Sequence, residues 1–228
     1  MTAPADLYQQ YHTYYENHLR SVAAKDEALA QQLRDYKFRI FFSNPPLAVA
    51  RNGLLVCGLK PYARTGQVYS FPPPTLPENY NAYLDETWST PYVRRVLRLI
   101  EMIQTISPGI ADPRRAVITQ WFYQRAEDAR QLKKFGLKLP DQLTFQQQVI
   151  NYYQPKILLC IGNGNDYSAF AGMVALHNAT VAAATTTPYL ERSQLKYLRT
   201  PERLIIGVPH LSRYPVNATL ETFIREII

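Results

Sequence analysis

Two loops of this sequence carry the side chains best suited to chemistry, and each loop follows a short apolar run. Lys60 comes two residues after the run Leu54–Gly58, and His210 comes two residues after the run Leu204–Val208. A primary amine can attack an electrophile or hold an anion, and an imidazole can move a proton or stabilise an oxyanion. Ligands of open α/β sheets bind at the carboxyl ends of the strands, so we expect the two loops to build one site.

Other motifs indicate structure rather than catalysis. Gly162-Asn163-Gly164-Asn165 lacks the spacing of a dinucleotide fingerprint or a P-loop, and predicts a glycine-rich turn between a strand and a helix. Two cysteines and four histidines show no metal-ligand spacing, and Ser212 is in no nucleophile elbow, so we expect no metal and no cofactor. Cys57 and Cys160 are expected to be buried free thiols in a reducing compartment.

Length and composition predict one soluble domain. The chain has 228 residues, of which 46% are hydrophobic and 19% charged. We expect a single domain over 1–228 with an N-terminal helical extension over about 1–40. No apolar run approaches the ~20 residues that span a bilayer, and the N-terminus resembles no signal peptide. We therefore expect an intracellular protein of the cytoplasm (nucleoid, or nucleus if eukaryotic or viral) that binds no membrane.

The charge balance favours a polyanionic partner. The formal net charge is +7, and it is combined with 17 Tyr, 9 Phe and 2 Trp. Basic groups hold phosphates, and aromatic faces stack on unpaired bases. Nucleic acid is the first candidate partner, although tyrosine is also common in protein cores and interfaces.

Apolar runs that alternate with helical patterns predict the fold class. Strands are expected at 54–58, 115–121, 156–162 and 204–208, with a further short strand at 180–186. One or two helices are expected at about 6–36, and further helices at 78–106 (interrupted before Pro91), 145–153, 166–176 and 217–228. Residues 71–77 are expected to form an extended linker and 125–140 a surface loop. Continuously apolar strands that alternate with helices are typical of a parallel sheet covered on both faces. We predict an α/β fold, a three-layer α/β/α sandwich around a central, mostly parallel, four-stranded sheet.

Three loops together resemble the motifs of family-1 uracil-DNA glycosylases. Gly58-Leu59-Lys60-Pro61-Tyr62-Ala63-Arg64-Thr65-Gly66-Gln67 is similar to the family's first motif, Gly-Gln-Asp-Pro-Tyr-His-x-x-Gly-Gln. Pro73-Pro74-Thr75-Leu76 resembles its Pro-Pro-Ser-Leu loop, and Val208-Pro209-His210-Leu211-Ser212-Arg213-Tyr214 resembles its His-Pro-Ser-Pro-Leu loop. Val56-Cys57-Gly58 and 118–123 are similar to the poxvirus branch. The resemblance covers about residues 40–225 and implies a uracil-DNA glycosylase-like domain that flips a base out of DNA.

The resemblance also implies a role for each loop residue. His210 would stabilise the oxyanion of the departing base. Phe71 would stack on that base, and Tyr62 would form the floor of its pocket. The residues implied in DNA contact are Gln67, Thr75 and Ser212 at phosphates, and Arg213 or Tyr214 in the emptied base stack.

Three departures from the family pattern concern the reaction itself. Lys60 replaces the aspartate that stabilises the cationic sugar, and an ammonium about 4 Å from that sugar would repel it by ~4 kcal/mol at an effective dielectric near 20. Leu59 replaces the second-position glutamine. The position of the asparagine that reads uracil is taken by Thr119, Gln120 or Trp121, of which Gln120 offers the same amide group on a longer arm. Efficient hydrolysis of uracil is therefore not expected.

Two functions remain open at this stage. The first is a DNA glycosylase of altered specificity, acting on a modified or non-uracil base in DNA repair or in defence against viral DNA. Burial would lower the pKa of Lys60, and the neutral amine would then attack the sugar or contact the base. The second is a catalytically inactive DNA-binding scaffold or processivity-type member, with a possible protein partner.

Overall fold

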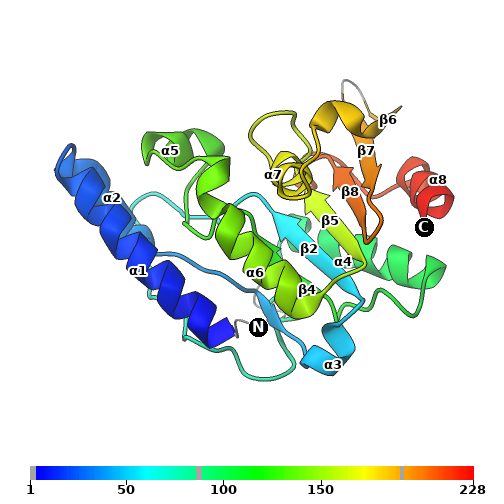
Figure 1. The fold of residues 1–228 in the computed structure, drawn as a ribbon, viewed down its shortest axis with the longest axis horizontal. Helices are drawn as coiled ribbons and strands as arrows, with labels where there is room; N and C mark the ends of the chain where they lie inside the picture. The colour runs from blue at the N-terminus through cyan, green and yellow to red at the C-terminus, as the bar shows by residue number, and fades with distance from the viewer. Residues whose placement is uncertain (1–3, 86–88, 191–192) are drawn as a thin grey trace.

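A computed structural model describes residues 4–85, 89–190 and 193–228. Its centre is a six-stranded sheet with the order β4-β2-β5-β8-β7-β6 (Figure 1). β2 (Leu54–Gly58), β4 (Val117–Gln120), β5 (Ile157–Ile161) and β8 (Leu204–Val208) are parallel to one another. β7 (Gln194–Arg199) and β6 (Thr185–Pro188) continue the sheet in antiparallel pairing beyond β8. The fold is thus mixed α/β with a mostly parallel sheet, as the apolar runs predict.

The sheet has six strands rather than the predicted four. The four expected strands form its parallel part. The short strand expected at 180–186 overlaps β6 only at residues 185 and 186, because 181–183 form a 3-10 helix instead. No strand was expected at β7, because Gln194, Lys196 and Arg199 interrupt its apolar pattern. Lys196 is nevertheless buried, and its Nζ donates a hydrogen bond of 2.5 Å to Asn165 Oδ1. Pairing with β8 and this one polar contact are what allow a charged side chain inside the strand.

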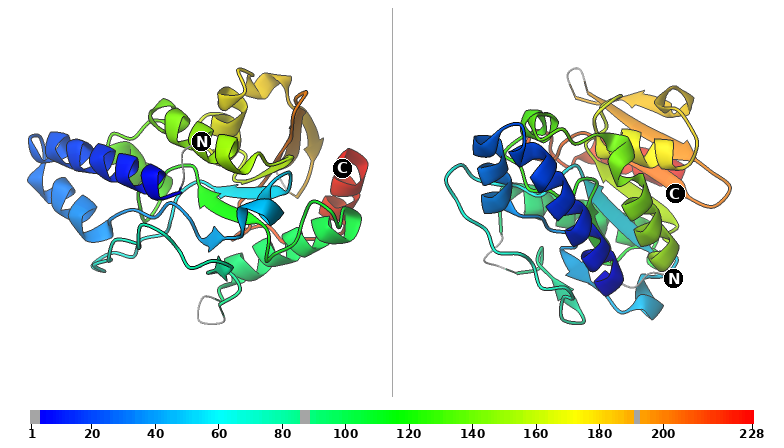
Figure 2. Two further views of the ribbon diagram at one scale, coloured as in Figure 1. Left: turned by 60° about the horizontal axis from the view of Figure 1, so that its bottom comes forward. Right: turned by 60° about the vertical axis from the view of Figure 1, so that its left-hand side comes forward.

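Helices cover both faces of the sheet (Figure 2). Leu54, Val56, Leu159 and Ile206 belong to one hydrophobic core, with residues of α4 (Pro91–Ile106) and α8 (Ala218–Ile227). The intervening strand residues, such as Leu55, belong to a second core. That core includes α1 (Pro4–Ala23), α2 (Glu27–Tyr36), α6 (Leu143–Tyr153) and α7 (Ala169–Leu176). Alternate strand residues therefore point to opposite helical layers, which makes three layers.

The helix boundaries follow from side-chain caps. Asp26, Thr90, Asp128, Ser168 and Asn217 each accept a hydrogen bond from a backbone N–H three residues later, and each stands directly before a helix. Pro91 occupies the first position of α4, where no N–H is required. The predicted helices at 6–36, 145–153, 166–176 and 217–228 are confirmed within a few residues.

Two segments differ from the predictions. The region 78–90 is not the start of a helix within its described residues. Tyr80–Asn81 instead form β3, which pairs with β1 (Ser43–Asn44), while 86–88 lie outside the described residues. Within 125–140, predicted as a loop, α5 (Ala129–Lys134) forms between the Asp128 cap and a left-handed Gly136, followed by the short 3-10 helix η2 (Leu139–Gln142). The six residues of α5 are too few to show a helical period in the sequence.

The remaining elements are short. They are α3 (Leu47–Ala50) and the 3-10 helix η3 (Val181–Ala183). Cys57 and Cys160 are free and buried, as predicted. In the described part of the chain, no helix is long and apolar enough to cross a membrane.

Candidate functional site

The carboxyl ends of β2 and β4 place Gln120 at the centre of the candidate site. Gly58 and Gln120 are register partners, and the Gln120 side chain lies directly over Gly58. A Cβ at Gly58 would stand 2.1 Å from Gln120 Oε1, so only glycine allows this arrangement. Beyond the strand ends, Trp121 N–H donates to the Gly58 carbonyl at 2.7 Å. The backbone thus fixes where the Gln120 amide lies, at the expected edge of the sheet.

Two tyrosines lie beside the Gln120 amide. Tyr83 is near both Tyr92 and the Gln120 side chain, and both groups act on its hydroxyl. Burial raises the pKa of Tyr83 to about 12, against the lowering effect of Tyr92, of the Arg39 charge and of Gln120. Both phenols therefore remain neutral hydrogen-bonding groups at physiological pH.

The His210 ring stacks on the ring of Tyr92. The ring centroids are 5.3 Å apart, and the angle between the ring planes is 24°. His210 Nδ1 lies 2.7 Å from Ser212 Oγ, and Arg95 Nη1 of α4 donates to the Leu211 carbonyl at 2.7 Å. The residue keeps an exposed side, but its ring is crowded by these neighbours. Burial, followed by the charges of Lys60 and Arg213, lowers the pKa of His210 below its ordinary value.

Lys60 lies close enough to His210 for its charge to act on the imidazole. Its Nζ donates to the carbonyls of Ala126 and Glu127, the latter at 3.0 Å. Burial lowers the pKa of Lys60 to about 8, although Asp128 and Glu127 act in the opposite direction. A substantial fraction of neutral amine is therefore accessible slightly above neutral pH, where an ordinary lysine has almost none.

The structure brings Lys60, Gln120 and His210 to one edge of the sheet, but not every residue that the resemblance implied. Phe71 packs with Phe38, Tyr15 and His12 at centroid distances of 5.2, 5.6 and 5.1 Å. It belongs to the aromatic layer under α1, not to the surroundings of His210. Leu59 is half-buried against the same core.

Of the other pocket candidates, the Thr119 side chain lies apart from those of Lys60, Gln120 and His210, whereas Tyr62 adjoins Lys60. Thr119 is fully buried, and its hydroxyl donates to the Ile40 carbonyl at 2.7 Å. Tyr62 is 65% exposed, and Lys60 Nζ lies 5.4 Å from its ring centroid. Of the two candidates on β4, Gln120 is therefore the one with a side chain in the cluster.

The expected DNA contacts lie at the surface in three places. Ser212, Arg213 and Tyr214 follow His210, and Tyr214 packs near Tyr189 with centroids 6.4 Å apart. Gln67 lies in the Lys60 loop, where its Oε1 accepts from the Tyr69 hydroxyl at 2.9 Å. Thr75 lies apart from both loops and lines a cavity of about 250 Å³, whose other lining residues include Tyr8, Phe41 and Tyr152.

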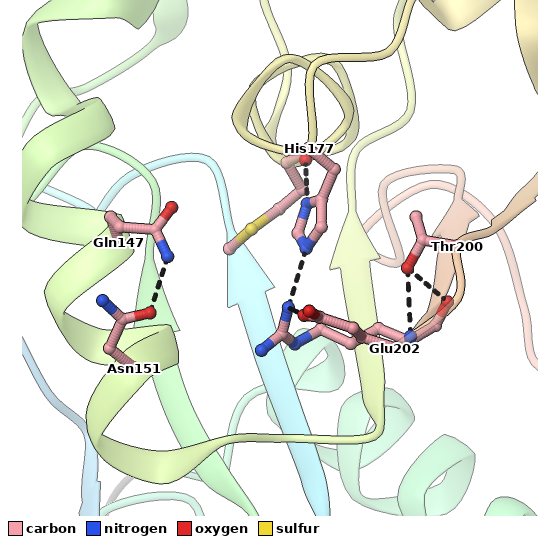
Figure 3. Close-up of polar contacts among 7 residues, drawn as sticks. Gln147, Asn151, His177, Thr200 and Glu202 are labelled. Carbon is pink, nitrogen blue, oxygen red and sulfur yellow. Dashed lines mark hydrogen bonds and ion pairs between the residues drawn. The ribbon is translucent and has the colours of Figure 1, made fainter.

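The other histidines serve the fold. His177 Nδ1 lies 2.8 Å from the Met173 carbonyl, and its Nε2 lies 3.3 Å from Arg203 Nη1 (Figure 3). Arg203 directly precedes β8, so this contact is at the amino end of the strand that delivers His210. His18 Nε2 lies 2.7 Å from the Phe135 carbonyl, and burial lowers the pKa of His18.

Tyr83, Tyr92 and Arg95 are residues near the site that the sequence did not predict. Tyr83 and Tyr92 lie within the segment predicted as one interrupted helix, and no periodic pattern distinguishes a tyrosine that faces a site from one in the core. Arg95 lies on the polar face of α4, where the sequence does not distinguish it from the neighbouring arginines. The only available signal was the cap and proline at Thr90-Pro91, which place the first turn of α4 after the loop.

Lys60, Gln120 and His210 do not form a set of metal ligands. The described residues hold no group of three or more His, Cys, Asp or Glu side chains that could bind a metal ion. Searches with family models, among curated proteins and among solved structures found no match to this chain. The case for a function therefore rests on the site itself.

Proposed function

We propose that this protein binds DNA at the carboxyl edge of its sheet and cleaves the N-glycosidic bond of an extruded base, which is a modified or non-uracil base. The observation that supports the reaction is that Lys60 and His210, 150 positions apart in the sequence, follow the carboxyl ends of two parallel strands, β2 and β8, in settings that lower the pKa of both. Perturbed titratable groups that converge at a sheet edge are typical of catalytic sites.

Lys60 and His210 have different roles in the proposed reaction. The lone pair of neutral Lys60 forms a bond to the sugar C1′, and the bond from C1′ to the base breaks, with its electron pair leaving on the base. His210 donates a hydrogen bond to the oxygen on which that negative charge develops. The sugar ring then opens to an imine on Lys60, and water hydrolyses the imine to release the sugar and restore the amine. No co-reactant other than water is required.

The surface around the two loops suits an extruded nucleotide. Tyr62 and Val68, at 65% and 71% exposure, are large apolar side chains on the Lys60 loop. Arg64 is exposed on the same loop, and Arg213 is exposed beside His210. Exposed aromatic and apolar side chains between cations are the combination that stacks on unpaired bases and neutralises phosphates.

A non-catalytic DNA-binding protein is the second candidate, and one specific observation favours it. The Lys60 amine donates to two backbone carbonyls, which stabilise its charged form and hold it away from a substrate. Under this proposal the same edge holds DNA or a partner protein on DNA without breaking a bond.

One experiment separates the candidates. The protein is incubated with oligonucleotides that carry uracil, mismatched thymine or modified cytosines, with and without borohydride, and DNA binding is measured in parallel. Abasic product that is lost in Lys60→Ala and His210→Ala but kept in Lys156→Ala supports the enzyme, because Lys156 is exposed at the opposite edge, directly before β5. A borohydride-trapped adduct that requires Lys60 supports the imine. DNA binding without release of any base supports the second candidate, and absence of DNA binding overturns both.

A further inference from the structure

A cavity of about 250 Å³ lies between the start of α1, the proline-rich segment 72–76 and the end of α6. Small molecules bind in hollows of this kind, where a mostly apolar lining holds a few polar groups. Ala5, Pro73 and Thr75 line the cavity and are exposed, so a ligand can enter it from solvent. The cavity is therefore a candidate binding site.

The cavity lies towards the opposite edge of the sheet from Lys60 and His210. Ser43, which lines it, donates from Oγ to the carbonyl of Ala116, the residue directly before β4. Tyr152 lines it from the last turn of α6, which precedes β5. Both contacts are near the amino ends of strands. A ligand in the cavity would therefore bind apart from the candidate site at the carboxyl ends.

Three aromatic rings in the lining are each packed on a further ring. Tyr8 packs on Phe38 with centroids 5.4 Å apart, and Phe41 packs on Tyr153 with centroids 6.0 Å apart. Tyr152 also packs on Tyr153, with centroids 4.9 Å apart. Because neighbouring rings hold them in place, these three rings keep the cavity preformed. A flat ligand can stack on such rings without the cost of ordering them first.

The proline-rich segment adds a stiff wall. The three prolines at 72–74 have a fixed φ, which keeps this part of the chain extended. Asn44, which also lines the cavity, donates from Nδ2 to the Leu76 carbonyl at 2.6 Å. This hydrogen bond joins two walls of the cavity and fixes the distance between them.

Size and polarity together select the ligand. An apolar cavity of ~150 Å³ holds one benzene ring, so a cavity of about 250 Å³ has room for two fused rings. None of the described residues that line it is charged, which disfavours a charged ligand. The lining does include the Asn44 amide and the hydroxyls of Tyr8, Thr75 and Tyr152, which can hydrogen-bond to nitrogen atoms of a ring.

We infer that this cavity binds a neutral purine-type base, stacked on its aromatic rings and hydrogen-bonded at its edges. The polar side chains of the lining come from α1, from the segment next to β4, from the proline-rich segment and from α6. Purines carry nitrogen atoms on both rings and so can use polar groups on several sides, whereas an indole has a single N–H. The inference does not rest on the proposed function, because neither Lys60 nor His210 lines the cavity.

Adenine is the probe for the cavity. The melting temperature should rise progressively with adenine concentration in the wild type, since a ligand of the folded state stabilises it by mass action. Ala5→Trp places a large ring at the exposed rim of the cavity and should lose this response. Ala28→Trp is the matched control and should keep it. Both alanines are exposed at the second position of a helix, but Ala28 lies on α2, away from the cavity lining.

No rise in the wild type, or an equal rise in Ala5→Trp, would overturn the inference. Saturation transfer from the protein to the adenine ring protons gives a reading that does not depend on thermal stability. It should occur with the wild type and Ala28→Trp and be lost with Ala5→Trp, whose fold is checked by circular dichroism. Indole is the comparison ligand, since it has two fused rings but fewer polar atoms. Binding of indole without binding of adenine would also overturn the purine assignment.

Lys60→Ala and His210→Ala separate this site from the proposed function. Both variants should keep the adenine response of the wild type. Loss of the response in either variant would mean that adenine binds at the carboxyl edge of the sheet, and would overturn the inference. Absence of DNA binding and of base release in the wild type would contradict the proposed function and leave the adenine response intact.

Discussion

The imidazole of His210 lies on the ring of Tyr92, with centroids 5.3 Å apart and planes 24° apart. The two residues come from different layers of the molecule, because Tyr92 belongs to the first turn of α4 and His210 follows β8. Arg95, one turn further along α4, donates to the Leu211 carbonyl and fixes the same loop. Helix α4 therefore supports the loop that carries His210, the residue proposed to stabilise the oxyanion.

Removing that support should change the titration of His210. Tyr92→Ala opens the ring to water, and since burial is the main cause of its lowered pKa, the pKa of His210 should rise. Tyr92→Phe keeps the stack and should leave the pKa closer to that of the wild type. The measurement is an NMR titration of the histidine ring protons, and it requires no catalytic activity. An unchanged pKa in Tyr92→Ala would show that the stack does not set the environment of His210.

Gly58→Ala should be destabilising because the new Cβ would stand 2.1 Å from Gln120 Oε1. Displacing a buried side chain in this way costs about 1–3 kcal/mol of unfolding free energy. Urea unfolding measures it, and Gly164→Ala is the matched control, because its Cβ would meet only Ser168 Cβ, at 3.8 Å. Adding Gln120→Ala to Gly58→Ala should recover part of the loss. Equal costs for the two glycine variants would rule out the proposed close approach.

Lys60 should make stability depend on pH in the alkaline range. Its pKa is about 8 in the folded protein and 10.5 in its ordinary state. Between these values the unfolded chain binds more protons than the folded one, so this residue makes the free energy of unfolding rise with pH, by at most about 1.4 kcal/mol per unit of pKa difference. Below pH 8 Lys60 is charged in both states, and the cost of burying that charge lowers the free energy of unfolding by its full amount.

The comparison with Lys60→Met isolates this contribution from the buried tyrosines, whose raised pKa values act in the opposite direction above pH 10. Chemical unfolding is followed from pH 7.5 to 10 in both proteins. The difference in stability between the variant and the wild type should shrink as pH rises. A difference that stays constant with pH would mean that Lys60 titrates normally in the folded state.

Tyr62 and Phe71 should separate binding from stability. Tyr62→Ala removes a mostly exposed side chain and should change the unfolding free energy by less than about 0.5 kcal/mol, while DNA affinity falls by about 1–3 kcal/mol if the ring stacks on a base. Phe71→Ala should cost about 1–3 kcal/mol of stability, because Phe38, Tyr15 and His12 lose a ring contact. If Phe71→Ala weakened DNA binding and left the stability unchanged, Phe71 would contact DNA rather than stabilise the core.

The sequence predicted those parts of the structure in which one residue type dominates a run. Leu54–Gly58 and Leu204–Val208 are apolar throughout, and both are central strands. β7 was not predicted, because its stability comes from pairing with β8 and from the contact between Lys196 and Asn165, neither of which is local. α5 was missed because a helix of six residues is defined by its Asp128 cap more than by any period.

The candidate site divides along the same line. Lys60 and His210 were expected to meet because both follow buried strands, which is a rule of parallel sheets. Phe71 was assigned by motif alone, and its place among the α1 rings depends on aromatic packing with Tyr15 and Phe38 that no motif encodes. Tyr83 lies in an irregular segment, where burial cannot be predicted from the sequence pattern.

The middle of the Lys60 loop has a freedom that the core elements lack. Residues 64–68 are exposed, whereas on either side Ala63 N–H donates to the Ala126 carbonyl and Tyr69 N–H donates to the Asp35 carbonyl. The two ends of the segment are thus fixed to the fold, and exchanges within residues 64–68 would leave the sheet register unchanged. This loop is the natural place to diversify in the laboratory when a new base or a new nucleotide is to be recognised.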